Sequence, residues 1–187
     1  SFSLDWERIN VFGDYGWLAW PLAIGVVTLN LRSIEHHPRL AGAWHAGGWW
    51  LLTFLLTAAG ASLAHDYFAR TVWPNVLWGA IPLAATMLVL RARARTHWPF
   101  RDFSESYFGW GWAVMLGYLL LFVLVSGVEP GDPKPLPYIV ILNPIELVQI
   151  AILLVGVGWI RNLGETQLAG VAKPAMIGLA AIAFAWL

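Results

Sequence analysis

The chain has 187 residues, equal numbers of acidic and basic side chains, and no cysteine. Hydrophobic residues make up 59% of it and charged residues 12%, about half of the roughly 25% usual in soluble domains, and a soluble core of this size could not hide that much apolar surface. The neutral charge argues against nucleic acid as a partner, and the lack of cysteine excludes disulfides, thiolate metal sites and a cysteine nucleophile within the chain.

Five apolar runs are long enough to cross a bilayer, which takes about 17 to 25 helical residues. A sixth run begins near Pro174 and ends at Leu187, too short for an unbroken crossing, and the chain starts at Ser1 without an initiator methionine. We therefore expect a piece of a longer protein, folded as an all-α, polytopic transmembrane bundle of five complete helices and part of a sixth. The predicted helices lie at roughly 16–31, 42–64, 72–90, 108–127, 144–160 and 174–187.

The first four runs form two similar helical hairpins, at about 14–66 and 75–127, offset by 61 residues. Both copies end their first run with arginine and continue into a basic loop, so they have the same orientation. This predicts a parallel repeat within one transmembrane module, a weaker sign of a transporter than an inverted repeat. The aligned pairs are Trp17/Trp78, Ala19/Ala80, Pro21/Pro82, Leu22/Leu83, Ala23/Ala84, Leu29/Leu90, Arg32/Arg93, His36/His97, Pro38/Pro99, Gly48/Gly109 and Trp49/Trp110.

The paired prolines Pro21 and Pro82 lie about one turn into their helices. A proline there is tolerated because the first amides of a helix lack partners in any case. The alternative interpretation is a matched pair of kinks that opens a cavity between the hairpins.

Basic residues predict the orientation in the membrane. Eight of the eleven Lys and Arg lie in the first, third and fifth loops, between 32 and 39, between 91 and 101, and between 161 and 173. By the positive-inside rule these loops are cytoplasmic. The N-terminal segment and the loop at 128–143 then face outward, which in a bacterium is the periplasm. The arginines at 91, 93 and 95 could also contact anionic lipid headgroups.

The outward loop at 128–143 is rich in proline and leads into the fifth helix. Asn143, Pro144 and Glu146 resemble a helix start with a capping residue, a first-turn proline and an acidic third residue. Glu146 and Gln149 share a face of a helix that enters the membrane, where a polar group by default suggests a site. The substrate-binding candidates are Tyr138, Asn143, Glu146 and Gln149.

The acid–base candidates are His65, Asp66, Glu129 and Asp132. His65 and Asp66 are adjacent, so on a helix they point about 100° apart and form no dyad with each other. Interfacial capping is the simpler role for them. The histidines at 36, 37, 45 and 97 lack the spacing of metal ligands, and we expect neither a metal nor a cofactor.

The strings PLPYIVILNPIEL and GWLAWPLAI resemble bacterial multi-pass proteins grouped as domain of unknown function 2339. The resemblance implies a bacterial inner-membrane location and a much longer parent chain, and it implies no activity. The residues that carry it in the loop are Pro135, Leu136, Pro137, Tyr138, Leu142, Asn143 and Pro144.

Three functions fit these features. The first is a transport or lipid-handling module whose substrate contacts the outer loop and the start of the fifth helix. The second is an outer-leaflet enzyme, such as a transferase that uses a lipid-linked donor. The third is a structural or assembly subunit. The expected partners are membrane lipids, with other helices of the same longer chain or a membrane protein as further candidates.

Overall fold

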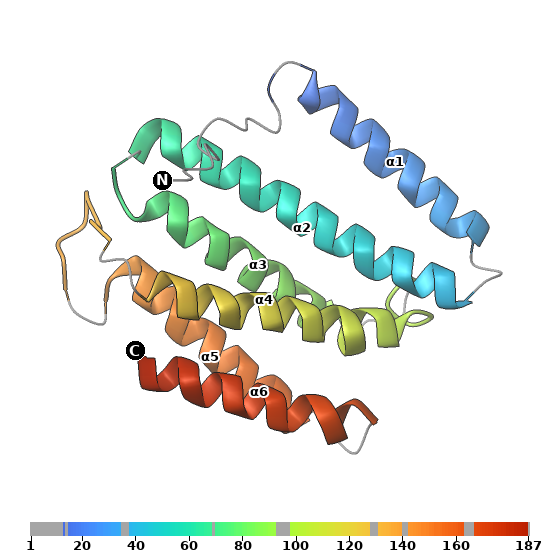
Figure 1. Cartoon of the computed structure of the whole chain (residues 1–187). Helices are drawn as coiled ribbons and strands as arrows, with labels where there is room; N and C mark the ends of the chain where they lie inside the picture. Colours follow the sequence, from blue (N-terminus) through green and yellow to red (C-terminus); the bar gives the residue numbers. More distant parts are fainter. Residues whose placement is uncertain are drawn as a thin grey trace, which may run out of the picture.

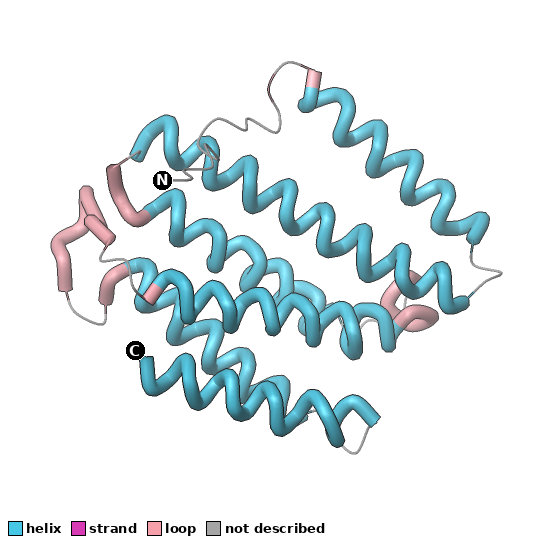
Figure 2. The backbone as a smooth tube through the Cα atoms, viewed as in Figure 1, coloured by secondary structure: helices cyan, strands magenta, loops and turns pink. Residues whose placement is uncertain are grey.

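The computed structural model describes residues 13, 15–34, 38–68, 70–92, 98–127, 131–139, 142–162 and 167–186. In these ranges all regular structure is helical and no strand occurs (Figure 2), which confirms the all-α prediction. The helices are α1 (Gly16–Ile34), α2 (Pro38–Phe68), α3 (Trp73–Ala92), the π-helix η2 (Ser106–Trp110) that runs directly into α4 (Gly111–Ser126), α5 (Pro144–Asn162) and α6 (Gln167–Trp186).

Three helical segments of the described ranges are long and apolar enough to cross a membrane: Leu40–Phe68, Trp73–Ala92 and Ser106–Ser126. Gly16–Asn30 and Pro144–Trp159 are apolar but shorter. These helices support the prediction that the chain is a membrane protein built from apolar helices. The number of complete spans and the parallel repeat stay predictions.

The helix bounds follow the hydropathy pattern closely, except at α6. This helix begins at Gln167 rather than near Pro174, and Pro174 lies inside it. The difference arises because one internal proline removes only one helical hydrogen bond, while the preceding residues, such as Leu168, Ala169 and Ala172, are good helix formers. The two hairpins also differ. Pro38 begins α2, whereas its counterpart Pro99 lies in a turn before η2.

The core of the described bundle centres on α4. In Figure 1, α1 and α6 lie at opposite edges, and α2 to α5 lie between them. The buried face of α4 packs against Leu83 of α3 and Ile152 of α5. Lipid tails are as apolar as these side chains, so close packing has to hold the helices together. The α4 residues buried there are Trp112, Leu116, Leu119, Leu120 and Val123.

Candidate functional site

The proline-rich loop is tied to the first turns of α3 and α5. The amide of Val72 donates to the Asp132 carbonyl (2.9 Å), and the Trp73 indole donates to the Lys134 carbonyl (2.9 Å). Asn143, just before α5, donates through Nδ2 to the Gly131 carbonyl (3.4 Å). These bonds hold the loop against the end of the bundle opposite the 98–103 turn (Figure 2).

Asn143 and Gln149 are each 2% exposed, and both have partners within the protein. Asn143 Oδ1 accepts the Ile145 amide (3.3 Å), the predicted helix cap. Gln149 Nε2 donates to Ser126 Oγ (2.9 Å), which in turn donates to the Phe122 carbonyl (2.7 Å). The polar groups therefore link α5 to α4 and to the loop, and a role for them in substrate binding stays a prediction.

The other predicted residues of this end are more open. Tyr138 is exposed and Glu146 half-buried. The Asp132 carboxylate is exposed and lies 2.9 Å from Lys134 Nζ. A hydrogen bond from the Lys134 side chain, followed in size by one from the Lys134 backbone amide, lowers the Asp132 pKa below its usual value. Glu129 lies outside the described residues.

His65 and Asp66 lie in the last turn of α2, half-buried and exposed respectively. A histidine in the last turn of a helix can hydrogen-bond the final backbone carbonyls, which have no helical partners, and this suits His65 to a capping role. An acid–base role for either residue stays a prediction.

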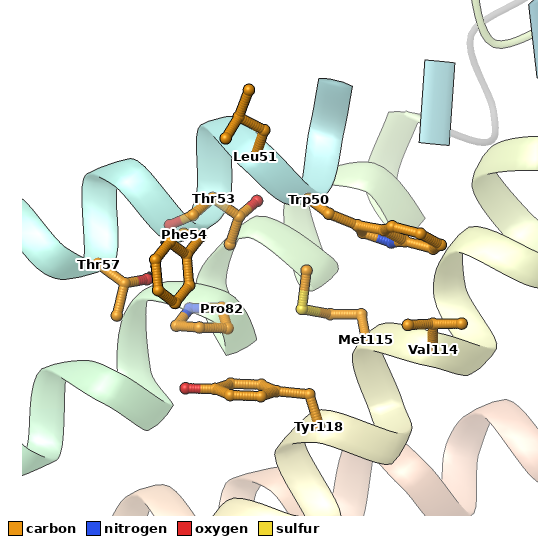
Figure 3. Close-up of a pocket in the computed structure, with 9 residues that line it drawn as sticks. All are labelled: Trp50, Leu51, Thr53, Phe54, Thr57, Pro82, Val114, Met115 and Tyr118. Atoms are coloured by element: carbon orange, nitrogen blue, oxygen red, sulfur yellow. Dashed lines mark hydrogen bonds between the residues drawn. The ribbon is translucent and has the colours of Figure 1, made fainter. Parts of the chain in front are cut away.

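An apolar cavity of about 370 Å³ lies between α2, α3 and α4, and we refer to it as the central cavity. Figure 3 shows the side chains of three helices converging on it. Its volume falls in the range of ordinary ligand sites, about 300 to 1,000 Å³. The lining residues are Trp50, Leu51, Thr53, Phe54, Thr57, Pro82, Val114, Met115 and Tyr118.

The polar hydrogens of the central cavity are donated to backbone carbonyls. Thr53 donates to the Trp49 carbonyl (2.8 Å) and Thr57 to the Thr53 carbonyl (2.8 Å). The indole of Trp50 donates to the Gly111 carbonyl (3.0 Å). Since these donors are already engaged, the cavity offers mainly hydrocarbon and aromatic surface to a ligand.

Pro82 explains how α3 and α4 are joined beside the central cavity. A proline has no N–H, so the carbonyl four residues earlier, that of Trp78, lacks its helical donor. The Tyr118 hydroxyl supplies one across the helix interface, at 2.9 Å. The prediction that Pro82 lies about one turn into its helix is wrong, because Pro82 is the tenth residue of α3. Pro82 lines the central cavity, whereas Pro21 is exposed on α1, and a matched pair of kinks stays a prediction.

Two further cavities adjoin the central one. The η2 cavity, about 510 Å³, shares Trp50 with it, and the Ser126 cavity, about 370 Å³, shares Tyr118. Together the three follow Ser106–Ser126, whose 21 residues span about 30 Å at 1.5 Å per residue, close to the thickness of the hydrocarbon core. The η2 cavity is lined by Gly42, Ala43, Ala46, Trp50, Glu105, Ser106 and Trp110, and the Ser126 cavity by Asn75, Trp78, Tyr118, Leu121, Phe122, Val125 and Ser126.

The sequence analysis did not single out Trp50, Thr53, Thr57 or Tyr118. A usable signal was present, because the two threonines are four residues apart and so share a face of one helix. In the described ranges, no group of three or more His, Asp or Glu is arranged to hold a metal ion.

A family model described as "Predicted membrane protein (DUF2339)" matches residues 2–187, nearly the whole chain. No curated protein and no solved structure matches it.

Proposed function

The chain belongs to the DUF2339 family of predicted membrane proteins, and from this premise we propose that it is a lipid-handling module that binds the acyl chain of a membrane lipid in the central cavity. The observation that carries the proposal is a cavity of about 370 Å³ with apolar walls, bordered by helices of which three segments are long enough to span a membrane. Lipid tails are the abundant apolar ligands around helices that span a membrane.

The wall chemistry favours a lipid chain over a polar solute. A polar group moved out of water costs free energy unless it finds a hydrogen-bond partner. The threonine and tryptophan donors in the wall already bond to backbone carbonyls, as does the Tyr118 hydroxyl. Transport of a polar solute is therefore less favoured than lipid handling. The basic loops support a bacterial inner-membrane location with those loops on the cytoplasmic side.

The test compares two valine-to-tryptophan variants. Val114 lines the central cavity on α4 and is 48% exposed, whereas Val157 on α5 is 40% exposed and lines none of the three cavities. We expect Val114→Trp to fill the cavity and to lower lipid occupancy, measured by native mass spectrometry of the purified protein, by about tenfold or more.

The Val157→Trp variant should retain lipid as the wild type does. Circular dichroism and size-exclusion chromatography establish that both variants fold. If folded Val114→Trp protein keeps the same lipids in the same amounts as Val157→Trp, the central cavity is not a lipid site.

A further inference from the structure

We infer that the bound lipid lies along α4 in one direction, with an amine-bearing headgroup in the η2 cavity and its acyl chain in the central cavity. This rests on the proposed function and adds the headgroup class and the orientation. Trp50 contributes to the lining of both cavities.

Trp50 marks the junction of the two cavities. Its indole Nε1 donates to the Gly111 carbonyl at 3.0 Å, where the π-helix passes into α4. Figure 3 shows the indole extending from α2 toward α4. A π-turn inside an α-helix is rare and occurs frequently at functional sites.

Polarity differs between the two cavities. The η2 cavity has the Glu105 carboxylate and the Ser106 hydroxyl in its wall, whereas no charged residue of the described ranges lines the central cavity. A lipid likewise has a polar headgroup joined to an apolar chain, so the headgroup fits the η2 cavity and the chain fits the central cavity. At the far end of α4, the Ser126 hydroxyl already bonds Phe122 and Gln149.

An exposed tryptophan in the wall of the η2 cavity agrees with a headgroup there. Trp110 in its wall is 61% exposed, and tryptophan rings prefer the interface between hydrocarbon and water. The exposed Arg101 lies in the turn just before this end of the helix.

The wall of the η2 cavity also has a defined shape. Gly42 allows α2 to approach η2, because a Cβ there would lie 2.6 Å from Ser106 Oγ. Nearby, buried His45 stacks on Phe103 at 4.0 Å and places Nδ1 3.0 Å from the Tyr107 hydroxyl. These contacts join α2 to η2 and to the turn before it, beside the cavity.

The carboxylate selects the headgroup. Among the described residues, Glu105 is the one charged side chain lining the η2 cavity, and a carboxylate attracts an ammonium group and repels an anionic headgroup. Phosphatidylethanolamine therefore fits better than phosphatidylglycerol. An exposed charge pair contributes modestly, so we expect a preference of about two- to fivefold.

The experiment uses two phosphatidylethanolamine probes in nanodiscs that hold the whole protein. One has a diazirine on the acyl chain next to the glycerol, and the other has it at the chain end. After illumination, mass spectrometry locates the cross-links. We expect the glycerol-side probe to label 42–50 and 105–110, and the chain-end probe to label 53–57 and 114–118.

Phosphatidylglycerol probes and two variants test the headgroup. Glu105→Gln should remove the preference for phosphatidylethanolamine, whereas Asp102→Asn, a change at an exposed carboxylate outside the cavity wall, should leave it intact. Labelling of 114–118 by the chain-end probe combined with glycerol-side labelling near 75–78 and 126 would overturn the orientation while the proposed function stands. An unchanged preference in Glu105→Gln would overturn the headgroup assignment. If neither probe labels the lining of any of the three cavities in the wild-type protein, the proposed function itself would be overturned.

Discussion

At the scale of single residues, hydrogen bonds from side chains to backbone carbonyls join and stabilise the helices in an apolar environment. Proline 82 removes a donor from α3, and the tyrosine of α4 replaces it. Within the hydrocarbon core no water can donate a hydrogen bond to the Trp78 carbonyl, so without the Tyr118 hydroxyl this carbonyl would have no donor. The same logic explains why the threonines of the central cavity donate to their own helix.

Tyr118→Phe should therefore destabilise the protein by about 1 kcal/mol, because the Trp78 carbonyl loses its donor. In a Pro82→Ala background the alanine N–H restores the helical bond, and Tyr118→Phe should then cost less. Unfolding of the four proteins in detergent measures this cycle. Equal costs in both backgrounds would show that the tyrosine does not substitute for the missing N–H.

Asp132 gives a prediction about pH. Hydrogen bonds from Lys134 lower its pKa in the folded protein, so its stabilising contribution is present above the unfolded value of about 3.9 and is lost as the pH falls through the folded value. NMR titration should place the Asp132 pKa below that of an ordinary aspartate, and Lys134→Met should raise it toward that value. The same pKa in both proteins would refute the pairing.

At the scale of elements, close approach of backbones decides which helices pack. On α3, a Cβ at Gly79 would collide with Phe122 of α4 and lie 2.8 Å from Val148 of α5. A small residue at this position allows three helices to meet, as is common in membrane bundles. The buried bond from Gln149 to Ser126 joins two of the same helices.

Gly79→Ala should destabilise the bundle by about 1 to 3 kcal/mol, since a packed core cannot absorb the added methyl group. The control is Gly117→Ala on α4, where a Cβ would meet nothing within 4 Å. That change should be neutral or slightly stabilising, because alanine favours helix more than glycine does. Thermal unfolding in detergent compares them, and equal stabilities would contradict the close packing at Gly79.

Gln149→Leu separates a structural role of the end of α5 beside the proline-rich loop from a binding role. As a structural link it should cost about 0.6 kcal/mol, the average for hydrogen bonds between membrane helices, and leave lipid occupancy of the central cavity unchanged. Native mass spectrometry and unfolding of the same samples check both. Loss of the bound lipid without loss of stability would favour the predicted substrate site at Asn143, Glu146 and Gln149.

At the scale of the whole molecule, the helices were predictable and the cavities were not. A chain in lipid must satisfy its backbone hydrogen bonds within each segment, so apolar runs predict α1 to α5 to within a few residues. The predicted start of the last helix near Pro174 is wrong, because α6 begins at Gln167 and continues through this proline. The central cavity depends on how three helices sit relative to one another, and that geometry has no local signature in the residues.

The candidate site was predictable only in part. Asn143 caps α5 as its sequence pattern predicts. The burial of Gln149 against Ser126 could not be foreseen, because the two residues belong to helices separated by the proline-rich loop. The sequence does not predict the role of Tyr118, because this role depends on the position of its hydroxyl beside the Trp78 carbonyl, which Pro82 leaves without a donor.

The most direct test of lipid binding is an experimental density map of the full-length protein in lipid nanodiscs. The account predicts elongated, chain-like density between Thr57 and Met115 in the central cavity, continuing past Trp50 toward Glu105. A map in which Phe54 and Met115 close over the space, with lipid density confined to the outside of the bundle, would contradict it.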